Sequence, residues 1–269
     1  MVFSGEQNPN RGQQLAMESA PVLQLEDLVV AYPGSADPTL DGLTLSLQRG
    51  ERLALVGPSG CGKSTVARAV LGLLPEGSSS QGRLELLGSD PRRLRRGALN
   101  RLRGEAVGLV FQDPMTRLNP LISIGDHLRD TLSAHGAQAA RAEELLQRVG
   151  IGPERMNSYP HQFSGGMRQR VAIALAMALQ PPLVIADEPT TSLDVAVAGQ
   201  VMAELTALCQ EAGSALLLIT HDLAMAGRWC QRMAVMQDGR LLEEASASEV
   251  LLHPQQPLTK RLVAAARQR

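Results

Sequence analysis

The sequence predicts an α/β fold with a mainly parallel sheet, an antiparallel β subdomain and an inserted α-helical subdomain. Three observations indicate this class. Short apolar segments alternate with helical patterns after about residue 180, which is typical of a parallel sheet covered by helices. The first 50 residues instead hold two β-rich segments with loose alternation, and residues 113–179 have mainly helical spacing.

The elements follow from these patterns in chain order. The two β-rich segments at the start predict antiparallel strands, and an apolar strand, a glycine-rich loop and a helix follow them. A polar loop at 77–82 separates this helix from two further strands. The expected strands are 22–32, 43–47, 52–57, 83–88 and 107–111, and the expected helix is 63–73.

The second half begins with helices, which Gly150–Pro153 interrupt, and then alternates strands with helices. Two expected helices start near Ala196 and after Asp222. The expected strands are LVIAD (183–187), ALLLI (215–219), RMAVM and GRLLE.

Composition excludes several classes of protein. The chain has 269 residues, 44% of them hydrophobic, and a formal net charge of -1. This near-neutral charge predicts no nucleic-acid partner. No apolar run approaches the roughly 20 residues of a membrane span, and the short run at 215–219 suits a buried strand. Three cysteines without a CxxC pair argue against disulfides and cysteine-ligated metals. The N-terminus lacks the apolar core of a secretory signal, so we expect a cytoplasmic protein.

The segment GPSGCGKST, residues 57–65, matches the phosphate-binding pattern G-x-x-x-x-G-K-[ST] between a strand and a helix, so it predicts a P-loop NTPase core. Backbone N–H groups would wrap the phosphates, Lys63 would place a charge on them, and Ser64 would offer a hydroxyl to Mg²⁺. The alternative is a chance glycine turn. Because a thiol at a helix N-terminus has a lowered pKa, we expect the same of Cys61. The predicted phosphate-binding residues are Gly57, Ser59, Gly60, Cys61, Gly62, Lys63, Ser64 and Thr65.

Two acids end the strand at 183–187. Asp187 is a candidate Mg²⁺ ligand, and Glu188 is a candidate base for polarising an attacking water. His221 follows the next apolar strand, at the sheet edge where ligands of open α/β sheets bind, and could contact a γ-phosphate. The alternatives are a solvated turn for the acids and a surface or capping role for the histidine.

A second candidate anion site lies at Ser164-Gly165-Gly166, which opens a long apolar helix. The free N–H groups and the dipole of a helix N-terminus attract anions. Because this turn belongs to the helical insertion, we expect it to serve the nucleotide of another subunit. A plain glycine-rich helix cap is the alternative.

These motifs, in this order and spacing, resemble those of the nucleotide-binding subunit of ABC transporters over residues 22–262. The resemblance implies a head-to-tail dimer that sandwiches two ATP molecules, each between one P-loop and the partner's SGG turn. It also implies that Tyr32 stacks on adenine, that Gln112 reaches Mg²⁺ and the attacking water, and that Asp194 contacts the partner subunit. The usual LSGGQ reads FSGGM here, with Phe163 and Met167.

Local stretches narrow the resemblance to the dipeptide, oligopeptide and nickel importers. QDPMTRLNP (112–120) and residues 159–176 are similar to that group, whereas the tail at 253–265 matches weakly. The chain lacks the C-terminal cysteine cluster of many peptide importers, which favours nickel-type or short peptide-type subunits.

The resemblance implies a peripheral protein on the cytoplasmic face of the inner (plasma) membrane. Its implied partners are two transmembrane permease subunits, a second identical or homologous ATP-binding subunit and, indirectly, an external solute-binding protein. Residues 116–128 are the candidate docking surface for the permeases, with packing inside the domain as the alternative for its apolar residues.

The expected organisation is a disordered lead-in at 1–20, an ABC ATPase domain at 21–245 with the helical insertion at about 113–179, and a short helical tail at 246–269. Three other functions compete. A soluble ABC ATPase acting on ribosomes or DNA would need a second such domain or a coiled coil. A small-molecule kinase would have no use for SGGMRQR. An exporter subunit would leave QDPMTRLNP unexplained.

Overall fold

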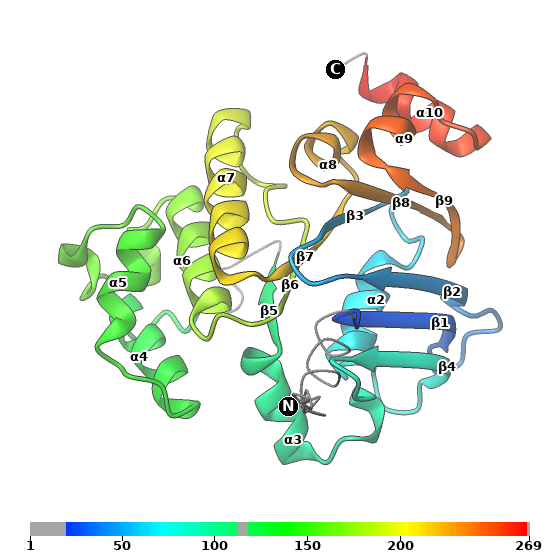
Figure 1. Ribbon diagram of the computed structural model, residues 1–269. Helices are drawn as coiled ribbons and strands as arrows, with labels where there is room; N and C mark the ends of the chain where they lie inside the picture. Colours follow the sequence, from blue (N-terminus) through cyan, green and yellow to red (C-terminus); the bar gives the residue numbers. More distant parts are fainter. Residues whose placement is uncertain (1–19, 112–117, 268–269) are drawn as a thin grey trace, which may run out of the picture.

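The computed structural model describes residues 20–111 and 118–267. The chain forms two sheets with helices packed around them, and a group of helices extends to one side (Figure 1). This is the predicted α/β class.

The first sheet is antiparallel, with strand order β2-β1-β4. Its strands are β1 (Leu23–Ala31), β2 (Leu40–Leu47) and β4 (Ser79–Leu86). Leu23 pairs with Leu47 on one side and Leu86 on the other, and all three side chains are buried. The expected loop at 77–82 is wrong in its second part, because residues from Ser79 onward pair with β1 despite their polar side chains.

The second sheet has six strands in the order β5-β6-β7-β3-β8-β9, and only β9 is antiparallel to its neighbour. The strands are β3 (Arg52–Val56), β5 (Val107–Val110), β6 (Leu183–Asp187), β7 (Ala215–Thr220), β8 (Arg232–Gln237) and β9 (Arg240–Ser246).

Both faces of this sheet are covered, which explains why its central strands are apolar without alternation. Leu53 and Leu55 pack with the leucines of the antiparallel sheet, whereas Ala54 and Val56 pack toward the helices of the other face. The six-stranded sheet therefore lies between two hydrophobic cores, which fix the position of the carboxyl ends of its parallel strands.

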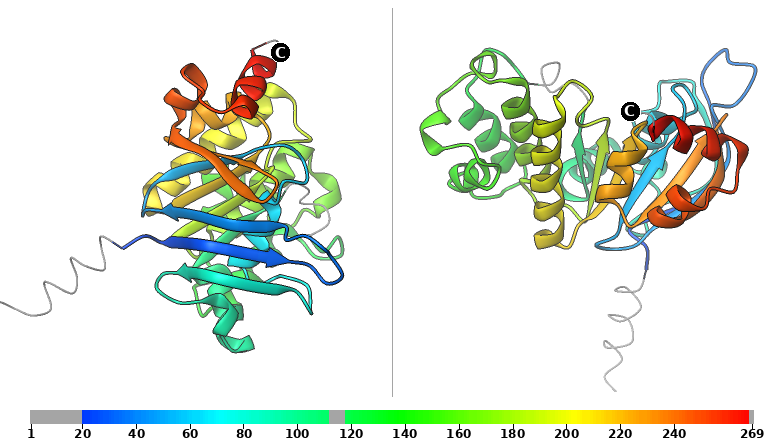
Figure 2. Two further views of the ribbon diagram at one scale, coloured as in Figure 1. Left: turned by 90° about the vertical axis from the view of Figure 1, so that its right-hand side faces the viewer. Right: turned by 90° about the horizontal axis from the view of Figure 1, so that it is seen from above.

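Helices lie in most of the connections between the strands. The helices α4, α5 and α6 of the region expected as the insertion lie to one side of the sheets in Figure 2, and α6 packs against β5. The helices are α2 (Lys63–Val70), α3 (Arg96–Glu105), α4 (Ile124–Ala134), α5 (Arg141–Arg148), α6 (Gly165–Met177), α7 (Val195–Ala212), α8 (Leu223–Trp229), α9 (Ala247–Leu252) and α10 (Pro257–Ala266).

Two details differ from expectation. Helix α2 ends at Val70 rather than near residue 73, because Gly72 takes a positive φ of 61° just beyond it. Helix α3 has no apolar periodicity to predict it, since it is rich in arginine and buries only Leu102. Within the described residues, none of the helices is both long and apolar enough to span a bilayer.

Candidate active site

The predicted P-loop lies between β3 and α2, with its glycines in the geometry that the turn requires. Gly62 has a φ of 105°, and a Cβ there would come within 2.8 Å of the Thr39 carbonyl. Lys63 is buried, and its Nζ donates hydrogen bonds to the carbonyls of Gly57 (2.8 Å) and Pro58 (2.9 Å). The loop therefore positions its own lysine charge at the start of α2, where helix N–H groups are free.

The expected lowering of the Cys61 pKa is wrong. Burial raises the pKa of this thiol, and the nearby Lys63 charge only partly opposes the shift. The thiol lies inside the loop against Gly57 rather than facing solvent. Cys61 therefore fills space beneath the phosphate loop.

Asp187, at the end of β6, lies against the start of α2. Its carboxylate is hydrogen-bonded to Ser64, and burial raises its pKa. Tyr32 approaches the same helix, with its hydroxyl 3.1 Å from Thr65 Oγ1 and accepting a hydrogen bond from Arg68 at 3.2 Å. The oxygen atoms of Asp187 and Ser64, which could ligate a metal ion, and the aromatic ring of Tyr32 thus lie close to one helix, α2.

Glu188 continues from Asp187 with a backbone φ of 49°, which non-glycine residues rarely adopt. Its N–H donates to the Ile219 carbonyl at 2.8 Å, so the bend is fixed by the neighbouring strand β7. The two successive acids consequently have different partners, Ser64 for Asp187 and His221 for Glu188.

The Glu188 carboxylate is held by donors from the loop after β6 and from the end of β7. His221 Nδ1 lies 2.7 Å from its Oε1, while Thr191 Oγ1 donates to its Oε2 at 3.0 Å and Thr220 Oγ1 at 3.4 Å. Because an ionised carboxylate only accepts hydrogen bonds, Nδ1 of His221 is the protonated nitrogen and Nε2 remains available. The two threonines were not predicted, although Thr191 lies within the acidic motif.

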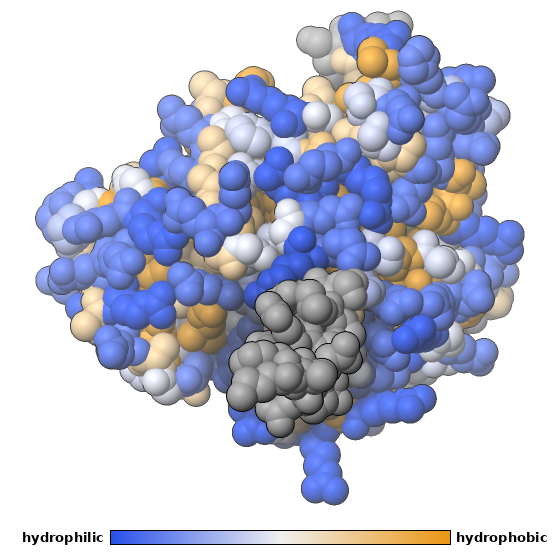
Figure 3. Space-filling model, viewed as in Figure 1, coloured by the Kyte–Doolittle hydropathy of each residue, from blue (hydrophilic) through white to orange (hydrophobic). Residues whose placement is uncertain are grey.

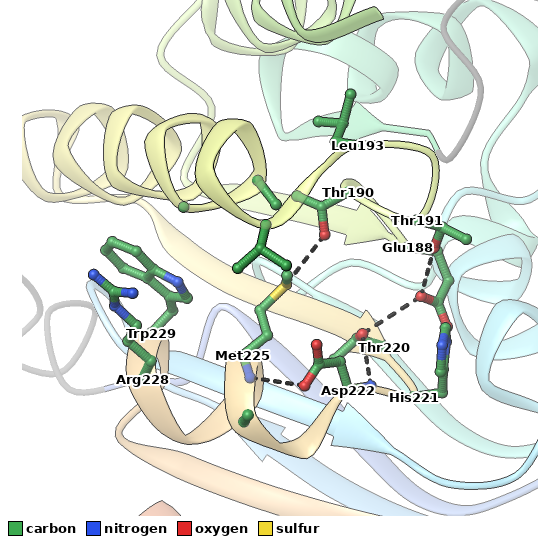
Figure 4. A pocket seen from close by; sticks show the side chains of 14 residues that line it. Glu188, Thr190, Thr191, Leu193, Thr220, His221, Asp222, Met225, Arg228 and Trp229 are labelled. Atoms are coloured by element: carbon green, nitrogen blue, oxygen red, sulfur yellow. Dashed lines mark hydrogen bonds and ion pairs between the residues drawn. The ribbon is translucent and has the colours of Figure 1, made fainter. Parts of the chain in front are cut away.

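This group borders a cleft of ≈330 Å³ between the loop after β6 and helix α8 (Figure 4). Glu188 and His221 form its polar end, and Met225 and Trp229 lie toward its apolar end, where Arg228 stacks at 5.0 Å on the Trp229 ring. The arrangement gives a carboxylate and an imidazole access to solvent beside the phosphate loop.

The second glycine turn lies at the start of α6. Ser164 is the N-cap of this helix, and its Oγ accepts from the Met167 N–H at 3.4 Å. Ser164 and Gly165 are exposed, whereas Gly166 is buried against α7. A Cβ at Gly166 would lie 2.5 Å from Val197, so this position has no room for a side chain. None of residues 164–167 lines the cleft beside Glu188 and His221.

Asp194 caps α7 and accepts from the Val197 N–H at 2.9 Å. The turn at the start of α6 and the start of α7 are thus packed on each other. Gln169, buried in α6, donates to the Phe111 carbonyl at 3.2 Å and links this helix to the end of β5. The predicted catalytic residue Gln112, next in the chain, lies outside the described residues.

A phosphate loop at the carboxyl edge of a parallel sheet, with acids at the end of β6, which β7 separates from the P-loop strand β3, defines a P-loop nucleotide-binding protein. A family model described as "ABC transporter" matches residues 40–191, more than half of the chain. The chain therefore belongs to the ABC transporter family.

Similar proteins of this family carry peptide-transport names. The chain is 42% identical over 250 residues to an oligopeptide transport ATP-binding protein of Mycobacterium tuberculosis, covering 89% of this chain and 41% of that protein. It is 40% identical over 253 residues to a dipeptide transport ATP-binding protein of Bacillus subtilis, covering 90% and 76%. The chain thus spans about two fifths of the mycobacterial relative.

Solved structures agree with the fold. A dimeric ATP-binding cassette in a post-hydrolysis state, bound to ADP and Pi, is 29% identical with a TM-score of 0.74, covering 84% of this chain and 98% of that one. A subunit of an ABC transporter complex from Clostridium perfringens is 26% identical with a TM-score of 0.77, covering 93% and 95%.

Proposed function

We propose that this chain is the ATP-binding and hydrolysing subunit that energises a membrane importer for peptides or nickel. The observation that carries the proposal is the pairing of Glu188 with His221 next to a complete phosphate loop. Family membership and the peptide-transport names of the relatives support the transport role.

The described residues divide the work of hydrolysis. Lys63 and the N–H groups of residues 57–65 would bind the β- and γ-phosphates, and Tyr32 would stack on adenine. Glu188 would orient and polarise the attacking water, a role worth on the order of 10²- to 10⁴-fold in rate. His221 would hold Glu188 through Nδ1 and contact the γ-phosphate through Nε2.

The donor set also fits Mg²⁺. The Ser64 hydroxyl and the Asp187 carboxylate are adjacent oxygen donors, joined by a hydrogen bond, and magnesium prefers such ligands. We infer that these two residues hold the ion, with Gln112 as a further predicted ligand. When bound, the ion neutralises charge on the phosphate oxygens.

The turn at Ser164–Gly166 supports an ATP-sandwich dimer, because its exposed Ser164 and Gly165 form a helix N-terminus that does not line the cleft of Glu188 and His221 in this chain. The similar cassette whose structure is dimeric supports the same arrangement. Asp194 would then contact the partner subunit next to its cap on α7. The partner is a second ATP-binding subunit, identical or homologous.

Docking on permease subunits is proposed for residues 118–128. Leu118 is buried, so its role is packing within the domain, but the Leu121 side chain is 81% exposed. This exposed leucine precedes α4 and offers an apolar contact to a membrane partner. We place the chain peripherally at the cytoplasmic face of the membrane, with two permeases and, indirectly, an external solute-binding protein as partners.

A tagged Glu188→Gln variant, incubated with MgATP and detergent-solubilised native membranes, tests this function. We expect recovery of two multi-span proteins, with or without a second ATP-binding chain, and their identity would define the cargo. Leu121→Asp in the same background is the control that should lose these proteins while still binding ATP. Recovery of ribosomes or DNA-repair proteins instead would contradict the transport role.

A further inference from the structure

Residues 90–105 form an arginine-rich segment that the proposed catalytic cycle does not use. The segment holds six arginines against two carboxylates, although the whole chain has a formal net charge of -1. It contains the end of the connection from β4, the short 3₁₀ helix η1 (Pro91–Arg93) and helix α3. Positive charge is therefore concentrated locally on a chain that is otherwise net acidic.

Two of these arginines hold the segment in place. Arg92 donates to Asp90, Ser80 Oγ and the Gly82 carbonyl. Arg103 donates to the carbonyls of Leu71 and Gly72, at 2.9 and 2.8 Å. Their guanidinium groups thus donate hydrogen bonds to other residues of the same chain.

The other four point outward and are called here the arginine patch: Arg93, Arg95, Arg96 and Arg101. The Arg93 side chain is 85% exposed, with Asp90 at 3.4 Å. The side chains of Arg95, Arg96 and Arg101 are exposed and make no ion pair or hydrogen bond to any described residue. Four like charges with Asp90 as the one carboxylate that an ion pair of the described residues places beside them repel one another, so the patch is a surface that an external anion would stabilise.

The apolar side chains of the segment are turned inward. Leu102 is buried, and Leu99 packs against Gly72. The surface that Figure 3 leaves uncovered just below the grey atoms, near the lower end of α3, is mostly hydrophilic. The patch therefore suits a charged surface rather than an apolar groove.

The position of the patch in the fold suggests which surface. Strand β5 is one edge of the six-stranded sheet; α3 leads into it, and the proposed docking segment 118–128 follows it in the chain. His135, at the end of α4, contacts Glu105 at the end of α3, with 3.1 Å between Nδ1 and Oε1. The opposite edge carries β9, against which α9 packs.

We propose that the arginine patch binds the anionic phosphate headgroups of the membrane on which the complex assembles. Guanidinium groups form bidentate hydrogen bonds with phosphate oxygens, and they are weakly hydrated, so their desolvation costs little free energy. Residues 90–105 contain no aromatic side chain on which bases could stack, which argues against single-stranded nucleic acid. The inference rests on the proposed function, since docking of 118–128 would bring this edge to the bilayer.

Vesicle flotation of the purified full chain tests this inference. One vesicle preparation is phosphatidylcholine alone, and in the other about a third of the lipid is phosphatidylglycerol. We expect binding only to the second. Each arginine near such a surface strengthens binding about fivefold, so Arg95→Gln, Arg96→Gln and Arg101→Gln together should weaken it on the order of 100-fold.

A matched variant separates the patch from net charge. Arg49→Gln, Arg155→Gln and Lys260→Gln together remove three exposed charges elsewhere and should leave binding within a few-fold of the unmodified chain. Added NaCl that shortens the Debye length from about 10 Å to about 3 Å should abolish binding. Equal losses in the two triple variants, or no preference for phosphatidylglycerol, would overturn the inference.

Fluorescent-nucleotide binding, measured on the same preparations, keeps the two proposals apart. Normal ATP binding without lipid preference would contradict the patch alone. Loss of ATP binding in the unmodified chain would contradict the proposed function, whatever the vesicles show. Soluble acidic peptide and unlabelled phosphatidylglycerol vesicles are compared as competitors of vesicle binding. If the peptide competes more strongly, the patch belongs to a protein partner and the lipid inference is likewise overturned.

Discussion

The two glycine-led helix starts of this chain have similar local chemistry and opposite surroundings. At the start of α2, Lys63 is buried and bonded to the carbonyls of Gly57 and Pro58, and Asp187 is hydrogen-bonded to Ser64. At the start of α6, Ser164 and Gly165 are exposed, and a Cβ on Gly165 would meet Leu193 of the same chain. The start of α2 lies beside the proposed catalytic groups, whereas the start of α6 offers its N–H groups and a serine cap outside the cleft of Glu188 and His221.

This difference indicates which site is complete in a single chain. A helix N-terminus attracts an anion, but hydrolysis of a phosphoanhydride also needs a positioned base and charge on the γ-phosphate. The start of α2 has both nearby, so it can hold the nucleotide. The start of α6 can only add donors to a nucleotide held elsewhere, which is what a second subunit would require.

The largest expected effect comes from removing the base beside α2. Glu188→Gln keeps the shape of the side chain but cannot accept a proton, so we expect ATP hydrolysis to fall by about 10²- to 10⁴-fold. ATP binding should persist, and an ATP-dependent dimer should accumulate on size-exclusion chromatography. Glu143→Gln, on the exposed face of α5, is the control. Near-normal turnover would remove Glu188 from its assigned role.

The second prediction tests whether the α6 turn serves a partner. Lys63→Ala should lose ATP binding through the missing phosphate charge. Gly165→Asp should leave the fold intact, because a Cβ there lies 3.5 Å from Leu193 and an acid suits a helix N-terminus, but its carboxylate would repel the partner's phosphates. Gly165→Ala is the neutral control, and each of the two charged-site variants alone should be inactive.

Mixing those two variants gives the decisive result. A mixed dimer joins the intact phosphate loop of one chain to the intact turn of the other, so about a quarter of the unmodified activity should return if sites act independently. The measurement is steady-state ATP hydrolysis at equal chain concentration. No recovery in a mixture shown to form mixed dimers would mean that the α6 turn does not act across subunits.

A smaller effect is expected from the threonine that holds Glu188. Thr191→Val removes the 3.0 Å hydrogen bond to Glu188 Oε2 without changing the side-chain shape, and should lower kcat about three- to tenfold with little change in KM. Thr191→Ser keeps the hydroxyl and should restore most of the activity. If valine and serine behave alike, the hydroxyl does not position the carboxylate.

The features of the two helix starts that the sequence predicted are those set by local patterns, and those it did not predict depend on contacts between segments far apart in the chain. The strand–loop–helix around Lys63 and the acids after β6 were predictable because short apolar strands and fixed glycine spacing are local patterns. The exposure of Ser164 was predicted only through its place in the helical insertion. Contacts between distant segments, such as Thr220 to Glu188 or Gly166 to Val197, have no local pattern and required the structure.

Two local arguments failed for the same reason. A helix N-terminus lowers the pKa of a thiol, but burial of Cys61 outweighs that effect and raises it. Polar residues at 79–82 favour a loop, but pairing with β1 extends the strand through them. Helix α3 shows the converse, since its arginines give no apolar pattern, and contacts with distant segments, among them those of Leu102 and Arg103, hold it. The roles of the site residues and the domain boundaries stay predictions.

The smallest effect should appear in stability, and it concerns the helix start with the catalytic groups. Because burial raises the pKa of Asp187, its charged form costs folding free energy at neutral pH, and stability is regained as the pH falls through the raised pKa. Asp187→Asn should therefore raise Tm without nucleotide at neutral pH, by about 2–4 °C for about 1 kcal/mol in a chain of this size. The gain should shrink on acidification, and Asp130→Asn, at an exposed position, should show neither effect in calorimetry. A lower Tm for Asp187→Asn would mean that the hydrogen bond from Ser64 outweighs the burial of the charge, and that this helix start does not store a free-energy cost for binding the metal.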